Sequence, residues 1–225
     1  GMDAPILQDV LKIENVHIAN ASSVYAIPIA HYVFSQILRW NKRIDHHIEY
    51  QQSKNWAPIA GDGELTNKTL VILGYGGIGS QVAKLGKAFG MRVTGIRRNP
   101  QDDEHADEVL GLDRFEELLP LTDYLVLSLP DSPQTRDIIN ADILEKINSS
   151  AMLINVGRGT AINEDDLTDA LNDGKIAAAA LDTTKVEPLD ANSSLWMAKN
   201  CFISAHDSAH SLLSLERAFE LFFQN

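Results

Sequence analysis

The sequence predicts an α/β protein built on a doubly wound parallel sheet. From Thr69 onward, short runs rich in leucine and β-branched residues alternate with amphipathic stretches, as expected of repeated βαβ units. A glycine-rich turn follows the first run, and reactive polar residues follow the later ones. The predicted strands are Thr69–Leu73, Arg92–Ile96, Tyr124–Leu127, Met152–Asn155, Ala177–Leu181 and Phe202–Ser204.

Signals at their ends define two of the helices between these strands. The stretch Ile78–Phe89 stops at Gly90. The stretch Glu164–Asn172 has Asn163 as its N-cap and Gly174 as its C-terminal stop.

The segment before the first strand predicts one long helix, from Tyr25 to about Gln51, with an apolar stripe. The stripe belongs either to the core or to a contact between two copies, because periodicity alone does not separate these alternatives. The stripe residues are Ile29, Val33, Ile37 and Trp40.

The acidic segment Gln101–Glu108 is predicted to be a solvated loop.

Composition places the chain in the ordinary globular class. It has 225 residues, of which 44% are hydrophobic and 22% charged. A net charge of -12 repels polyanions and anionic membrane surfaces, which argues against nucleic-acid and membrane roles. The single cysteine cannot form an internal disulfide, and no export signal is recognised, so we expect a cytoplasmic protein.

The glycine pattern Gly74-Tyr75-Gly76-Gly77-Ile78-Gly79 lies between a predicted strand and a predicted helix. The first glycine permits a tight turn, the second lets the backbone approach a diphosphate, and the last lets helix pack on strand. The helix N-terminus adds free N–H groups and positive potential. The pattern predicts a Rossmann-type dinucleotide-binding domain; a glycine turn without a ligand is the alternative. The predicted cofactor-binding residues here are Gly74, Gly76, Gly77, Ile78 and Gly79.

Arg97 and Arg98 follow the second predicted strand, where NAD-specific sites carry an acidic residue for the ribose hydroxyls. Two guanidinium groups attract a 2′-phosphate through charge-assisted hydrogen bonds. The sequence therefore favours NADP, with NAD possible. The alternative is that one arginine stacks on adenine or points to solvent.

Three later strands end in residues suited to reducing a carbonyl next to a carboxylate. These are Asn155-Val156-Gly157-Arg158-Gly159, Leu181-Asp182 followed by Glu187-Pro188, and Ser204-Ala205-His206. Ligands gather at the C-terminal ends of strands in open α/β sheets. Taken singly, Arg158 is explained as a surface charge, Glu187 as a loop carboxylate and His206 as a loop histidine.

Together and in this order, these motifs resemble the D-isomer-specific 2-hydroxyacid dehydrogenase family. The resemblance runs from about Ile18 to the C-terminus. It implies that Arg158 holds the substrate carboxylate, that His206 donates a proton and that Glu187 pairs with this histidine. It is specific at the glycine turn, Phe89-Gly90-Met91, Leu129-Pro130 with Thr135, Asn155-Val156-Gly157-Arg158-Gly159, Ala180-Leu181-Asp182, Glu187-Pro188 and His206.

The same resemblance implies further contacts to the cofactor. Asp182 and the backbone around Val156 match positions that meet the nicotinamide carboxamide, and Leu129-Pro130 matches the segment beneath the adenosine. The remaining cofactor-binding positions that it implies are Thr135, Gly157 and Ser208.

Members of the family also have a separate, flavodoxin-like substrate domain, of which we expect only remnants here. The predicted division is residues 1–20 as substrate-domain remnant and linker, 21–209 as dinucleotide-binding domain, and 210–225 as the start of the returning helix. Gly1-Met2-Asp3 resembles the family's substrate loop. His31 and Thr183 replace a usual glutamate and valine. His210 lies four residues after His206, but no third ligand is evident and no metal site is predicted.

Two alternatives to an oxidoreductase remain open, a sensor or scaffold and a methyltransferase. An oxidoreductase acting on a small 2-oxo acid with NADP(H) explains Arg158, Glu187 and His206. A non-catalytic NAD(P) sensor or scaffold of the same family has no chemical need for a proton donor. A methyltransferase on a related fold gives no reason for Arg97 or Arg98. The family further implies a homodimer formed through the long N-terminal helix.

Overall fold

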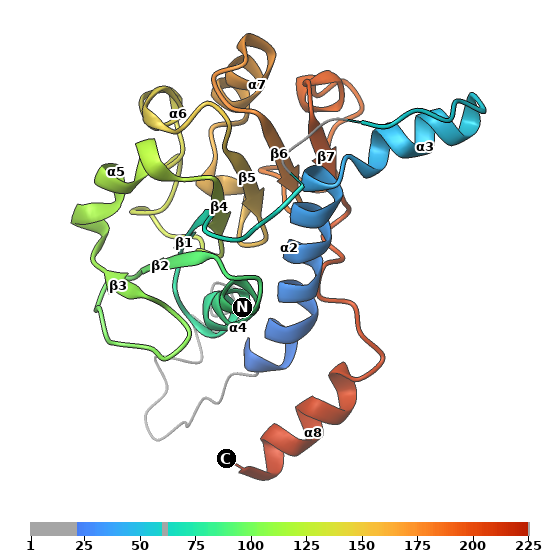
Figure 1. The fold of residues 1–225 in the computed structure, drawn as a ribbon. Helices are drawn as coiled ribbons and strands as arrows, with labels where there is room; N and C mark the ends of the chain where they lie inside the picture. The colour runs from blue at the N-terminus through green and yellow to red at the C-terminus, as the bar shows by residue number, and fades with distance from the viewer. Residues whose placement is uncertain (1–21, 60–62, 225) are drawn as a thin grey trace.

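A parallel sheet of seven strands forms the centre of the computed structural model, which describes residues 22–59 and 63–224 (Figure 1). The strand order is β3-β2-β1-β4-β5-β6-β7. The chain winds outward in both directions from the adjacent strands β1 and β4, which confirms the predicted doubly wound sheet. The strands are β1 (Thr69–Leu73), β2 (Arg92–Ile96), β3 (Glu108–Leu110), β4 (Tyr124–Leu127), β5 (Met152–Asn155), β6 (Ala178–Leu181) and β7 (Cys201–Ile203).

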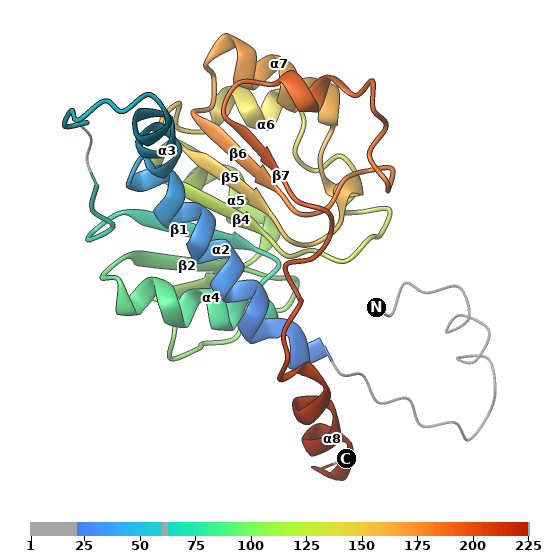
Figure 2. The same ribbon diagram turned by 90° about the vertical axis from the view of Figure 1, so that its right-hand side faces the viewer.

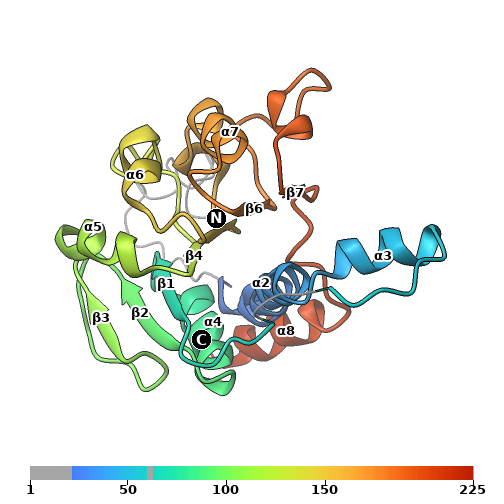
Figure 3. The same ribbon diagram turned by 45° about the horizontal axis from the view of Figure 1, so that its top comes forward.

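Helices cover both faces of the sheet (Figures 2 and 3). Alternate side chains of a strand point to opposite faces of the sheet. Ile72 packs in the hydrophobic core formed with α2 and α4, whereas Val71 packs in the hydrophobic core formed with α5, α6 and α7. The α-helices are α2 (Ala26–Asn41), α3 (Ile44–Gln52), α4 (Gly77–Ala88), α5 (Phe115–Leu118), α6 (Ala141–Lys146), α7 (Glu164–Asp173) and α8 (Ser214–Gln224), with 3-10 turns at Ser22–Tyr25, Leu112–Arg114, Leu119–Leu121, Gly159–Ala161 and Ser194–Met197.

The predicted ends of α7 are confirmed. The Asn163 side chain accepts a hydrogen bond of 3.2 Å from the Asp166 amide, and Gly174 closes the helix in the left-handed conformation, with φ of 74°. The six predicted strands are all present, although β6 begins one residue later than predicted and β7 begins and ends one residue earlier.

The prediction of one helix from Tyr25 to Gln51 was wrong, because the helix breaks after Asn41. Arg43 adopts a left-handed conformation with φ of 53°, which no glycine or proline announces. Contacts of neighbouring side chains hold this break. The Arg43 guanidinium lies 4.8 Å from the centre of the Trp40 ring, and Arg39 pairs with Asp45 across the break at 2.7 Å.

The prediction that residues Gln101–Glu108 form a solvated loop was wrong at their C-terminal end. Glu108 opens β3, and the Asp107 carboxylate accepts a hydrogen bond of 2.8 Å from the Val93 amide. β3 has only three residues, paired with the end of β2, so no alternating pattern marks it in the sequence.

The apolar stripe of α2 belongs to the core. Ile29, Val33 and Ile37 are all buried against the sheet within one chain. Helix α8, in contrast, stands away from the sheet and exposes Phe219 and Phe222 (Figure 2). None of the helices that the structure describes has both the length and the apolar character needed to cross a bilayer. The predicted remnant at residues 1–20, with Gly1-Met2-Asp3, lies outside the described residues.

Candidate active site

The glycine turn joins β1 to α4 at the switch point of the sheet. Gly74 has φ of 104°, and a Cβ atom there would lie 2.8 Å from the backbone of Ser128. A Cβ atom at Gly79 would lie 3.1 Å from Ile72, so this glycine permits close packing of helix on strand. A Cβ atom at Gly76 or Gly77 would meet no protein atom within 4 Å. The fold itself does not need these two exposed glycines, which leave room for a diphosphate at the N-terminus of α4.

The loop after β4 contacts this turn and is closed by a hydrogen bond of its own. Ser128, at the end of β4, donates a hydrogen bond of 2.8 Å to the Gly74 carbonyl. In the same loop, Thr135 donates to the Pro130 carbonyl at 2.8 Å. The structure therefore places Leu129, Pro130 and Thr135 on one closed loop beside the glycine turn. No motif singled out Ser128, because its contact is made with a distant segment.

Arg97 and Arg98 follow β2 on the other side of the turn. The Arg97 amide bonds to Leu110 at 3.0 Å, and the Arg98 side chain is exposed. The loop that follows also carries Asp103, whose carboxylate lies 3.4 Å from the Ser80 hydroxyl of α4. A carboxylate six residues after Arg97 therefore contacts the helix that follows the glycine turn.

A buried amide shapes the loop that presents Arg158. The Asn155 side chain accepts from the Gly157 amide and donates to the Arg158 carbonyl, both at 3.0 Å. Asn155 is completely buried, so it acts inside the loop. The sequence motif included Asn155, but its structural role was not predicted.

The glycines on either side of Arg158 are required by the fold. A Cβ atom at Gly157 would lie 2.7 Å from the backbone of Leu129, and one at Gly159 would lie 1.9 Å from the backbone of Thr184. The loops after β4, β5 and β6 are therefore in backbone contact around Arg158. Its guanidinium bonds to the Gly157 carbonyl at 2.9 Å.

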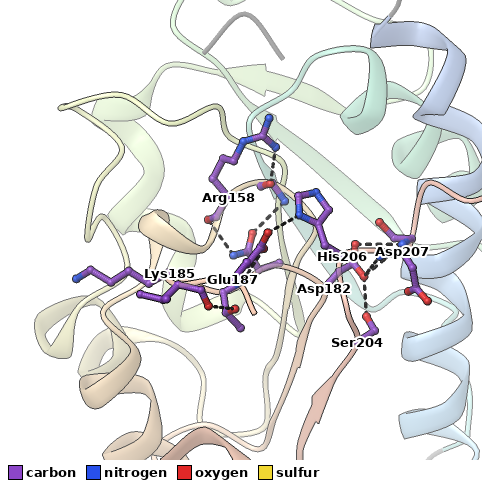
Figure 4. A network of polar contacts seen from close by, with 12 residues as sticks. Arg158, Asp182, Lys185, Glu187, Ser204, His206 and Asp207 are labelled. Atoms are coloured by element: carbon purple, nitrogen blue, oxygen red, sulfur yellow. Dashed lines mark hydrogen bonds and ion pairs between the residues drawn. The ribbon is translucent and has the colours of Figure 1, made fainter. Parts of the chain in front are cut away.

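His206 and Glu187 form the predicted pair. The Nδ1 atom of His206 lies 2.8 Å from Oε2 of Glu187, while Oε1 accepts from the Thr184 amide at 3.2 Å (Figure 4). Both carboxylate oxygens are thus engaged, which fixes the carboxylate, and Nδ1 rather than Nε2 of the ring faces it. Both side chains are about half exposed, at 48% and 41%.

Asp182 lies beneath the loop that carries His206. Its carboxylate is 1% exposed and accepts hydrogen bonds from the Ser204 hydroxyl at 2.6 Å, the Asp207 amide at 3.1 Å and the Ser208 amide at 3.2 Å. Asp182 and Ser208, both implied as cofactor contacts, are therefore in contact with each other.

A cavity of about 500 Å³ adjoins the His206–Glu187 pair. Within the described part of the chain, no group of three or more histidine, cysteine, aspartate or glutamate residues is arranged to hold a metal ion. The cavity is lined by Asp182, Thr184, Glu187, Pro188, Leu189, Trp196, Ile203, Ser204, Ala205 and His206.

Arg158, Glu187 and His206 thus follow the adjacent parallel strands β5, β6 and β7, at the rim that also carries the glycine turn. This rim is where open α/β sheets bind their ligands. A glycine turn open to a diphosphate, with an imidazole–carboxylate pair and an arginine along the same rim, defines the cofactor-binding domain of a dehydrogenase.

The family follows from comparison with known proteins. Residues 34–208 match the model of the NAD-binding domain of D-isomer specific 2-hydroxyacid dehydrogenases. The chain belongs to this family, as its motifs predicted.

Similar proteins include enzymes named for 2-oxo acid reduction. The human glyoxylate reductase/hydroxypyruvate reductase is 33% identical over 212 residues, covering 92% of this chain and 64% of the human protein. The structure of a D-isomer specific 2-hydroxyacid dehydrogenase family protein from Aeromonas salmonicida has a TM-score of 0.85 at 32% identity, covering 97% of this chain and 71% of the other.

A second solved structure contains a cofactor. The NADPH-dependent glyoxylate/hydroxypyruvate reductase from Sinorhizobium meliloti, in complex with NADP and sulfate, has a TM-score of 0.80 at 25% identity, covering 96% of this chain and 69% of the other. Against the first curated relatives that it matches, the chain spans 59% to 68% of their length.

Proposed function

We propose that this chain is the cofactor-binding part of an NADPH-dependent reductase of small 2-oxo acids. The observation that carries the proposal is the bond of 2.8 Å between His206 and Glu187, beside Arg158 at the C-terminal rim of the sheet. A sensor or scaffold needs neither an oriented proton donor nor a positive group placed for a carboxylate. The names of the relatives agree with this substrate class.

Separate residues of this chain bind the cofactor and the substrate. The amides at Gly77 and Ile78 bind the diphosphate of the cofactor at the N-terminus of α4, and Gly76 leaves room for it. Arg158 binds the substrate carboxylate and holds the carbonyl in a fixed orientation. When bound, the reduced nicotinamide supplies the hydride that adds to the carbonyl carbon.

The proton comes from the protein. His206 gives the proton on Nε2 to the carbonyl oxygen, which becomes the hydroxyl of the 2-hydroxy acid, and the ring is left neutral. Glu187 orients the ring and sets which nitrogen faces the substrate. Positioned proton donation of this kind is worth about 10²–10⁴ in rate.

NADPH is the proposed cofactor because Arg97 and Arg98 follow β2, where the 2′-phosphate of the adenosine would lie. The test compares the dissociation constants of NADPH and NADH by fluorescence titration, for the wild type and Arg97→Asp. A variant that loses the preference for NADPH supports the assignment. An unchanged preference contradicts it.

Turnover tests the reaction itself. The complete protein, of which this chain is proposed to be the cofactor-binding part, is mixed with NADPH and glyoxylate, hydroxypyruvate, pyruvate or a bulkier 2-oxo acid, and the absorbance of NADPH is followed. No turnover on any of them, in a protein that binds NADPH, would favour the sensor.

We retain the predicted division of the chain as part of this proposal: 1–20 as remnant and linker, 21–209 as dinucleotide-binding domain, and 210–225 as the start of the helix that returns to a substrate domain. The apolar residues exposed on α8 support the last assignment, because they suit a surface that packs against another element.

A homodimer is also proposed, although not through the stripe on α2, which the core already uses. Helix α3 has no buried residue, and its Ile44 and Ile48 are exposed together with Trp56 just beyond it. Sedimentation equilibrium at micromolar concentration tests this proposal. A protein that sediments only as monomer would contradict it.

A further inference from the structure

We infer that Tyr32 and Ser204 are positioning residues for His206 and act through the buried carboxylate of Asp182. The inference rests on the proposed function, in which His206 is the proton donor. It assigns a role to a chain of three side chains that joins helix α2 to the loop after β7.

Asp182 organises the backbone on which His206 sits. The Asp182 carbonyl accepts from the His206 amide at 2.8 Å, and its carboxylate accepts from the amides of Asp207 and Ser208 at 3.1 and 3.2 Å. His206 itself has φ of 53°, a left-handed conformation that non-glycine residues hold only where the surroundings enforce it. The loop thus folds around Asp182, and the direction of the imidazole depends on where Asp182 stands.

The hydroxyl groups continue this network toward α2. Ser204 donates to Asp182 at 2.6 Å, and the hydroxyl oxygens of Ser204 and Tyr32 are also 2.6 Å apart. A carboxylate only accepts, so the single hydroxyl proton of Ser204 is committed to Asp182, and Tyr32 must donate to Ser204. Burial raises the pKa of Tyr32 to about 12, which outweighs the lowering effect of its bond to Ser204, and the phenol keeps its proton.

Helix α2 gives this network a rigid anchor. Val33 and Ile37, which follow Tyr32 along the helix, are completely buried in the core. Figure 4 shows Ser204 and Asp182 between the α2 ribbon and the His206 ring. The network therefore ties the proton donor, which is half exposed, to a fixed element on one face of the sheet. Chains of hydrogen bonds in such surroundings hold a geometry more tightly than single contacts do.

The variants Tyr32→Phe and Ser204→Ala test this inference. Each removes one hydroxyl and leaves the shape of the side chain nearly unchanged. We expect either substitution to lower kcat about tenfold to a hundredfold, as misplacement of a reacting group by about 1 Å does. We expect KM and the dissociation constant of NADPH to stay within about twofold of the wild type. Tyr25→Phe is the matched control, because Tyr25 lies on the turn before α2 with its side chain about half exposed.

Two further measurements separate positioning from a general loss of structure. Ser204→Thr keeps the hydroxyl and should retain most of the activity. The double variant Tyr32→Phe/Ser204→Ala should be no slower than the slower single variant, because the two residues act in series. A wild-type kcat in either single variant, additive losses in the double variant, or an equal loss in NADPH affinity would overturn the inference.

Amide hydrogen exchange at Ser208, measured by NMR, requires no turnover. The exchange should be faster in both single variants than in the wild type and in Tyr25→Phe. If the wild type reduces no 2-oxo acid, the proposed function fails, and exchange alone then decides whether the hydroxyl chain holds the loop. Unchanged exchange at Ser208 would show that it does not.

Discussion

The glycine turn allows a test that separates the demands of the fold from those of a ligand. A Cβ atom at Gly76 would meet no protein atom within 4 Å, whereas one at Gly79 would lie 3.1 Å from both the Gly74 carbonyl oxygen and Ile72. The two substitutions Gly76→Ala and Gly79→Ala add the same methyl group three residues apart. Gly76→Ala should therefore weaken NADPH binding without lowering stability, whereas Gly79→Ala should lower stability.

The magnitudes follow from these contacts. Gly76 has φ of -122° and caps α4, so alanine fits there, and the change in the free energy of unfolding should stay within about 1 kcal/mol. The methyl group would occupy space that we assign to the diphosphate, and overpacking of about 1–3 kcal/mol weakens binding roughly 5- to 150-fold. At Gly79 the same cost of about 1–3 kcal/mol applies to folding. It lowers Tm by roughly 2–4 °C for each kcal/mol in a protein of this size.

Thermal unfolding without ligand and fluorescence titration with NADPH measure the two effects. The expected result is a Gly76→Ala protein with wild-type Tm and weak NADPH binding, and a Gly79→Ala protein with a lowered Tm. The reasoning would be refuted if Gly76→Ala bound NADPH as tightly as the wild type. It would equally be refuted if Gly76→Ala lost as much stability as Gly79→Ala.

Two further predictions concern the loops that carry the site. Glu187→Gln keeps the shape of the side chain but removes the charge beside His206. A hydrogen bond to a charged group is worth about 1.5–3 kcal/mol, so kcat should fall roughly 10- to 150-fold while NADPH affinity is kept. Steady-state kinetics and titration measure both quantities, and an unaltered kcat would contradict the assigned pair. Asn155→Ala leaves a buried amide and carbonyl without a partner, which should cost about 1–3 kcal/mol and lower Tm by roughly 2–12 °C in a thermal melt. A wild-type Tm in that variant would show that Asn155 does not hold the Arg158 loop.

The sequence predicted most of the sheet because its strands are buried on both faces and therefore read as continuous apolar runs. The glycine turn and the helix caps were equally visible, since each depends on residues within a few positions of one another. The features that sequence reasoning missed lack such local signals. β3 is too short to show a pattern, and the break after Asn41 depends on Arg43 in a conformation that its residue type does not announce.

The candidate site divides in the same way. Arg158, Glu187 and His206 belong to motifs, so they could be named, and the contact between the last two is confirmed by their distance of 2.8 Å. Tyr32 and Ser204 are 172 residues apart, and nothing in either neighbourhood indicates that their hydroxyl groups meet. Such a contact arises only when α2 packs beside β7, so it follows from the tertiary structure.

The short motif around Arg158 contains both residues that the packing of the fold requires and a residue that we assign to the site. Gly157 and Gly159 are fixed by backbone contacts to Leu129 and Thr184, where a Cβ atom would lie 2.7 and 1.9 Å from its neighbours. Arg158, between them, carries the guanidinium that we propose binds a carboxylate. The glycines bring three loops together, and this close approach places the guanidinium at the rim beside the acid–base pair. The packing of the loops therefore determines where the Arg158 guanidinium lies.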